Sequence, residues 1–202
     1  MFKNDRWIKE QAAQGMITPF EPGMVREVRR EPAAAMEWPR SVLSYGCSSY
    51  GYDMRLSPKE FQIFQHVPGT VMNPKRFNPN NLTLAELQHD KDGDFFILPG
   101  HTYGLGVVIE KLRVPRNCTV ICLGKSTYAR LGIIVNATPA EAGWEGHLTL
   151  EFSNSSAADC RIYAGEGVCQ LLFAEGEPCE VTYADRRGKY QGQRETVVTA
   201  RV

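Results

Sequence analysis

The chain has 202 residues, and its 23 basic and 23 acidic side chains give a formal net charge of zero. This length suits a single domain with its own hydrophobic core, so we expect one domain over residues 1–202. A neutral chain lacks the broad basic surface of a nucleic-acid-binding protein, and no apolar run approaches the ~20 residues that span a membrane. We therefore expect no nucleic-acid or membrane partner. In the absence of a signal segment, we expect a cytoplasmic location.

The first predicted element is a short amphipathic helix over residues 5–14. Trp7, Ile8 and Ala12 recur at helical spacing and are expected to face inward. Gly15 follows directly and is a typical helix stop.

After residue 15 the helical period disappears, and short runs of β-type residues alternate with turn clusters. Many short strands at this spacing favour a mainly β fold of the sandwich or jelly-roll type. The segments 26–40 and 73–94 read as loops or inserts. The Gly-rich basic tail from Asp185 reads as either a frayed end or a lid. The predicted strands span residues 61–65, 70–72, 95–98, 103–110, 119–123, 133–136, 147–153, 161–163, 168–174 and 180–183.

Six cysteines and four histidines bear on redox and metal chemistry. The sequence has no Cys-x-x-Cys pair, its histidines are scattered, and it lacks the zinc deaminase pattern of His-x-Glu followed by Pro-Cys-x-x-Cys. We therefore expect free thiols in a reducing compartment, with Cys118 and Cys122 as small buried residues of a strand. We expect no protein-bound zinc.

A candidate anion site follows the predicted strand that ends at Gly124. Ser126 can cap a single helical turn that stops at Gly132. The N-terminus of a helix offers free backbone N–H groups and a partial positive charge, which suit a phosphate. Arg130 lies four residues after Ser126 on the same face of the turn, with Lys125 beside it.

A candidate proton-transfer group lies about twenty residues later. Glu151 alternates with Leu150 and Phe152 in a predicted strand and so points to the face opposite their apolar side chains, with Thr149 and His147. A carboxylate in this position either faces water or lies in a pocket that raises its pKa and lets it move protons. The strand alone leaves both interpretations open.

These two motifs belong to a longer set of sequence blocks. Together they resemble the dCTP deaminases of the proteobacterial type, in the dUTPase-like superfamily. The resemblance implies a distorted jelly roll or β-barrel with a short N-terminal helix and a C-terminal lid over about residues 185–202. It also implies a homotrimer with active sites built between subunits. The matching blocks are residues 5–8, 16–20, 44–53, 122–130, 144–154, 166–170 and 183–193.

The resemblance implies hydrolysis of dCTP to dUTP and ammonia, with Glu151 as the general acid/base that activates water against C4 of cytosine. Ser126 and Arg130 are the other implied catalytic residues. Magnesium is expected to enter on the triphosphate, as that ion commonly does, and dTTP is implied as a feedback inhibitor. The implied substrate-binding residues are Lys125, Ser126, Thr127, Tyr128, Ala129, Arg130, Thr149, Leu150, Glu151, Gln170, Tyr183, Lys189 and Gln193.

Several features leave alternatives open. The loop 136–144 is shorter than in some deaminases of the family and carries Ala140 where relatives often have a bulkier residue. Gln170 opens a core strand and also reads as structural, and Ser48, Ser49 and Asp53 read as turn-forming residues. A bifunctional enzyme that continues from dCTP to dUMP and pyrophosphate remains an alternative, and a non-catalytic nucleotide-binding protein is a weaker one. A dUTPase alone is disfavoured, because the segments 141–144 and 188–193 differ from that family's hairpin and lid.

Overall fold

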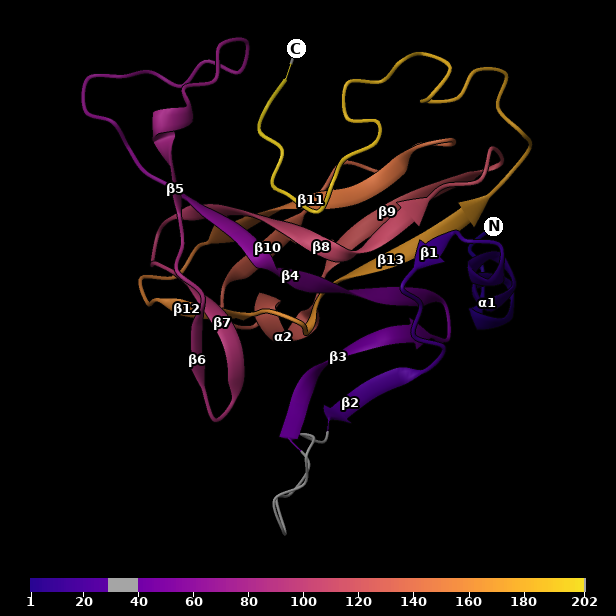
Figure 1. Ribbon diagram of the computed structural model, residues 1–202, viewed down its shortest axis with the longest axis horizontal. Helices are drawn as coiled ribbons and strands as arrows, with labels where there is room; N and C mark the ends of the chain where they lie inside the picture. Colours follow the sequence, from indigo (N-terminus) through magenta and orange to yellow (C-terminus); the bar gives the residue numbers. More distant parts are fainter. Residues whose placement is uncertain (29–39, 202) are drawn as a thin grey trace.

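The computed structural model describes residues 1–28 and 40–201, so residues 29–39 of the predicted 26–40 insert and Val202 of the predicted lid lie outside the described residues. The fold is mainly β, as predicted (Figure 1). No helix among the described residues is long and apolar enough to cross a membrane. In chain order, the elements are α1 Asp5–Ala13, β1 Ile17–Thr18, β2 Met24–Val28, β3 Arg40–Ser48, β4 Gly51–Phe64, η1 Pro79–Asn81, β5 Leu82–Leu84, β6 Gln88–Asp90, β7 Gly93–Leu98, β8 Tyr103–Arg113, β9 Cys118–Gly124, α2 Ser126–Ala129, β10 Ile133–Asn136, β11 Glu145–Asn154, β12 Cys160–Tyr163 and β13 Gly167–Glu175.

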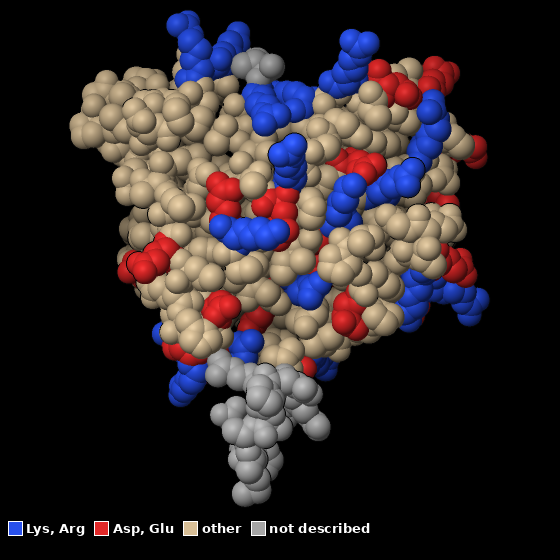
Figure 2. All heavy atoms as spheres, in the orientation of Figure 1, with Lys and Arg blue, Asp and Glu red and all other residues tan. Residues whose placement is uncertain are grey.

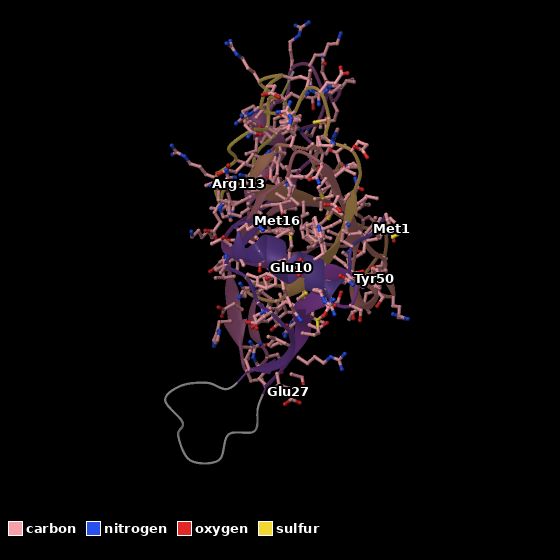
Figure 3. The ribbon with its side chains drawn as sticks, turned by 90° about the vertical axis from the view of Figure 1, so that its right-hand side faces the viewer. Met1, Glu10, Met16, Glu27, Tyr50 and Arg113 are labelled. Carbon is pink, nitrogen blue, oxygen red and sulfur yellow. The ribbon has the colours of Figure 1, made fainter. Side chains whose placement is uncertain are left out.

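Helix α1 confirms the predicted N-terminal helix. The side chain of Asn4 accepts a hydrogen bond from the backbone N–H of Trp7 and so caps the helix at its start. Gly15 follows the helix with a φ of 87°, a left-handed conformation that glycine adopts without strain. Ile8 is buried, and the ring of Trp7 packs 6.0 Å from that of Phe173. Figure 3 looks onto this flank and shows α1 in front of the sheet, with Glu10 on it.

A curled ten-stranded sheet forms most of the molecule. Its main path runs β10-β11-β8-β4-β13-β9, so β11 lies between β10 and β8. A smaller sheet of β12, β7 and β6 packs beside it. Aromatic rings join the two sheets, because Phe61 of β4 lies 5.2 Å from Phe96 of β7 and 5.3 Å from Phe152 of β11.

Most of the predicted strands are present, some with longer bounds, but two predicted strands are absent, and the segment 73–94, predicted as a loop or insert, contains η1, β5 and β6. Residues 70–72 form no strand. Val71 is 92% exposed, so its side chain does not pack against a sheet. Residues 180–183 also form no strand. There the backbone N–H of Thr182 donates to Asp185, and the N–H of Asp185 donates back to the hydroxyl of Thr182. This reciprocal pair makes a local turn that competes with a strand.

The hairpin of β3 and β4 was not predicted as strands before residue 61. Its residues are rich in Ser, Gly and Tyr, and the pairing of Gly46 with Asp53 holds it in register. Ser49 lies in the turn, as predicted, but Ser48 is the last residue of β3 and Asp53 is a buried residue of β4, so neither forms the turn. Cys118 and Cys122 are buried, and all six cysteines are free, as predicted.

Candidate active site

A cavity of about 930 Å³ lies between β8, β11 and the C-terminal tail. Its other walls are the loop 137–141 and segments of residues 64–82. The lining is largely apolar with a few polar groups, which is the usual composition of a small-molecule site. Five of the predicted substrate-binding residues line it, namely Thr149, Glu151, Tyr183, Lys189 and Gln193.

Glu151 lies on the cavity side of β11. Its neighbours Leu150 and Phe152 point into the core and are fully buried, as the strand alternation predicted. Burial raises the pKa of the Glu151 carboxyl, and a hydrogen bond of 3.4 Å from Asn136 Nδ2 opposes this rise only in part. The carboxyl therefore holds a proton more readily than an exposed glutamate does, which suits a group that takes up and releases protons.

Tyr103 is a second titratable group on the same side of the sheet. The register places Glu151 opposite Leu105 and Ser153 opposite Tyr103, so Tyr103 and Glu151 are diagonal neighbours on one face. Burial and the charge of Glu151 together raise the pKa of Tyr103 to about 12. Its hydroxyl therefore stays protonated at neutral pH and can donate a hydrogen bond into the cavity.

The C-terminal tail forms one wall of the cavity and is fixed by aromatic residues. Trp144 Nε1 donates to the carbonyl of Tyr190 over 2.9 Å, and the backbone N–H of Tyr190 donates to the hydroxyl of Tyr183 over 3.0 Å. A side chain at Gly188 would lie only 2.0 Å from the ring of Tyr183, so the close approach requires glycine. The tail is an ordered wall and not a frayed end.

Gln193 brings a polar group to this wall. It pairs with Gly146 as an added parallel bridge, and its carbonyl accepts from the backbone N–H of His147 over 3.0 Å. Its side-chain Oε1 is buried without a hydrogen-bond partner among the described residues. A buried acceptor without a partner is costly, so this atom suits a ligand N–H donor.

The predicted anion turn forms α2, with one correction. Lys125 is the residue that precedes the first turn, and Ser126 is the first helical residue, so Ser126 does not cap the helix with its side chain. Thr127, Ala129 and Arg130 are exposed with Ser126, and Arg130 donates to the carbonyl of Ser126 over 3.2 Å. Gly132 ends the turn with a φ of 82°, as predicted.

Three other predicted site residues have core or structural contacts. Tyr128 is buried, and its hydroxyl accepts from the backbone N–H of Tyr163 over 2.8 Å. The side chain of Leu150 is fully buried on the core face of β11, so only its main chain can face a ligand. Gln170 does not line the cavity; its Nε2 donates to Asp53 Oδ1 over 3.0 Å.

Lys125 is paired inside the protein. Its Nζ contacts the Asp53 carboxylate and donates to Ser44 Oγ over 3.1 Å, and the Lys125 and Asp53 side chains are only 10% and 5% exposed. The carboxylate compensates the charge of Lys125, and the pair anchors the start of α2 to β4. Local sequence patterns favoured a turn at Asp53, because they do not reveal a buried partner that lies 72 residues away in the chain.

The predicted site residues therefore form two groups within one chain. No residue of α2 lines the cavity that holds Glu151. In Figure 1, α2 lies below β8 and β4, whereas the C-terminal tail lies above them. Residues that sequence reasoning missed in the cavity include Tyr103, Leu105 and Val198. Strand register and the path of the tail bring them there, and neither could be deduced from local patterns.

The charges around these groups are mixed. On the face seen in Figure 2, basic and acidic side chains are interspersed, in keeping with the zero net charge. Within residues 1–28 and 40–201, no group of three or more His, Cys, Asp or Glu side chains is arranged to hold a metal ion.

Comparisons with family models and with curated proteins point to one family, and comparison with solved structures supports the fold. A family model described as dCTP deaminase-like matches residues 2–176. The chain is 49% identical over 195 residues to a dCTP deaminase of Xylella fastidiosa and 51% identical over 193 residues to one of Paracidovorax citrulli, covering 95% of this chain and 94% of each relative. Among solved structures, it resembles the 2'-deoxycytidine 5'-triphosphate deaminase of Agrobacterium tumefaciens with a TM-score of 0.55 and 18% identity. That match covers 87% of this chain and 48% of the solved chain, and supports the fold alone.

Proposed function

The chain belongs to the dCTP deaminase-like family, and on this basis we propose that it hydrolyses dCTP to dUTP and ammonia. The observation that carries this proposal is the half-buried Glu151 carboxyl in a largely apolar cavity of about 930 Å³. A reaction that adds water to cytosine needs one group that first accepts a proton and then returns it. Among the described residues that line the cavity, Glu151 is the carboxylate whose pKa burial raises.

In the proposed reaction, Glu151 takes a proton from a water molecule as the water oxygen forms a bond to C4 of the cytosine. Glu151 delivers this proton to N3 in the addition step. It then takes the proton of the new C4 hydroxyl and passes it to the exocyclic amino group, so that the C4–N4 bond breaks and ammonia leaves with the C4 carbonyl restored. The Tyr103 hydroxyl and the unpartnered Gln193 Oε1 are the polar groups that orient the base in this cavity.

We propose that the anion turn completes the site of a neighbouring subunit in a homotrimer. Ser126, Thr127 and Arg130 are exposed, yet they do not line the cavity of their own chain. Exposed aliphatic residues surround this turn, namely Leu123, Leu131 and Ile134. An exposed apolar patch beside a candidate phosphate site suits contact with a second copy of the chain. Light scattering should give the mass of three chains, and a fully active monomer would contradict the shared site.

Magnesium is proposed to enter with the triphosphate as part of the substrate, and the reaction is proposed to need no zinc. The test is to incubate the purified protein with dCTP and magnesium and to resolve the products. We expect dUTP and ammonia with little pyrophosphate, and the same rates after zinc-selective chelation and restoration of magnesium. Release of dUMP and pyrophosphate would favour the bifunctional alternative, and dependence on zinc would overturn the metal-independent mechanism.

A further inference from the structure

A bulge in β4 forms a receptor for the end of the chain. The pairing of β4 with β8 is irregular between Leu56 and Phe61, so residues 57–60 leave the regular ladder. Ser57 is fully buried in this bulge, and its hydroxyl donates to Glu195 Oε1 over 2.7 Å. The Lys59 ammonium contacts the other oxygen of the same carboxylate. Both oxygens of Glu195 are therefore held by the bulge.

The residues after Glu195 are held in the same region. The backbone N–H of Val197 donates to Glu60 Oε2 over 2.8 Å, and that of Val198 donates to Thr149 Oγ1 over 3.1 Å. Thr149 lies two residues before Glu151 on the same face of β11. Val198 and Ala200 line the cavity beside Thr149 and Glu151. The tail thus crosses the cavity next to the proposed proton-transfer group.

The tail then returns to its own start. Lys189 Nζ donates to the carbonyl of Arg201 over 2.5 Å, and the backbone N–H of Arg201 donates to the Tyr190 hydroxyl over 3.1 Å. Lys189 and Tyr190 also line the cavity. Residues 189–201 therefore form a closed strap, and its only carboxylate is the one seated in the bulge.

Glu195 is charged in this position. Burial alone would raise the pKa of its carboxyl, but the hydrogen bonds from Lys59 and Ser57 more than offset burial and hold the pKa below its usual value. The Lys59 side chain is 62% exposed and the Glu195 side chain 21%, so the contact is stronger than an exposed ion pair mainly because the fully buried Ser57 hydroxyl donates to the same carboxylate.

We propose that the Ser57–Lys59–Glu195 contact is a latch that positions the tail as a wall of the nucleotide cavity. Glu195 is a positioning residue, because it acts through Val198 and Thr149 and does not itself line the cavity. With the latch closed, the tail separates the cavity around Glu151 from bulk solvent and presents Lys189 and Gln193 to the nucleotide. This inference rests on the proposed deaminase function for its kinetic effect, but the latch itself can be measured without activity.

The test uses charge reversal in the full-length protein. Glu195→Lys and Lys59→Glu should each speed deuterium exchange in the segment 195–201 and raise KM for dCTP about tenfold with little change in kcat, as expected for the loss of a charge-assisted hydrogen bond. The double variant Lys59→Glu/Glu195→Lys should restore both readouts in part. Ser57→Ala removes one hydrogen bond without adding charge, and it keeps the test valid if a charge reversal fails to fold.

The matched control is the exposed pair of Lys9 and Asp5 on α1, whose reversal should change neither exchange in the tail nor KM. Unchanged exchange of the segment 195–201 in Glu195→Lys and Ser57→Ala would overturn the latch. Faster exchange with an unchanged KM would overturn its role in substrate binding. A wild-type protein that does not turn over dCTP would instead contradict the proposed function, and the exchange readout separates the two failures.

Discussion

Asn136 on β10 lies directly opposite Glu151 on β11, and its Nδ2 donates a hydrogen bond of 3.4 Å to Glu151 Oε2. This contact favours the charged carboxylate, whereas burial favours the neutral carboxyl. Burial has the larger effect, so the pKa of Glu151 is raised. The pKa of the group that we propose to transfer protons is therefore raised by burial and lowered, to a smaller extent, by its cross-strand partner Asn136.

The raised pKa of Glu151 predicts the pH dependence of the wild-type reaction. The carboxylate must be deprotonated to accept a proton from water, so activity should fall as the pH drops through its pKa. Because burial raises that pKa above the ordinary value of 4.5, the acidic limb of the kcat/KM profile should lie above 4.5. Steady-state rates over a series of buffers check this. An acidic limb at or below the ordinary value would contradict the proposed role of the pocket.

Removing the Asn136 amide should move that limb further. Asn136→Ala deletes the hydrogen bond that lowers the pKa of Glu151 and leaves the effect of burial in place. The acidic limb should therefore shift to higher pH than in the wild type. Asn117→Ala is a suitable control, because Asn117 bonds Glu175 and does not line the cavity. A shift to lower pH, or an equal shift in the control, would show that the contact does not act on Glu151 as argued.

The buried pair of Lys125 and Asp53 should act on stability. Lys125→Met leaves the Asp53 carboxylate buried without its cation, and should lower the free energy of unfolding by about 3–5 kcal/mol. Lys125→Met/Asp53→Leu should recover part of the loss, since neither charge then remains. Chemical denaturation measures this, with the exposed Lys9→Met as a control that should change little. A stable Lys125→Met protein with a raised KM would instead make Lys125 a phosphate ligand.

The shared site can be tested by mixing two inactive variants. Glu151→Gln and Arg130→Ala damage different groups of residues, so trimers assembled from both chains should contain some sites with neither defect. At random mixing, about half of the sites take Glu151 from an intact chain and about half of those take an intact Arg130, which gives about one quarter of wild-type activity. Activity is measured after the two chains are expressed together. No recovery in well-formed mixed trimers would place both residues in the site of one chain.

Local patterns predicted much of this fold but not the joining of its parts. The alternation around Glu151 was sufficient to assign its face, and Gly15 and Gly132 marked the ends of two helical segments correctly. The pairing of Lys125 with Asp53, by contrast, joins residues 72 apart, and the latch joins Ser57 to a residue 138 positions away. Such contacts depend on strand register and on the path of the tail, which no local spacing reveals. For the same reason, the separation of α2 from the cavity became visible only in the folded chain.

The most direct test of the account compares Glu151→Gln with the wild type in turnover and in nucleotide binding. The amide keeps the size and much of the hydrogen bonding of the carboxyl but cannot accept the proton from water. We expect kcat to fall by ~10²–10⁴-fold, the usual range for loss of a general acid/base, while calorimetry shows dCTP binding close to that of the wild type. Turnover near the wild-type rate in Glu151→Gln would contradict the proposed mechanism.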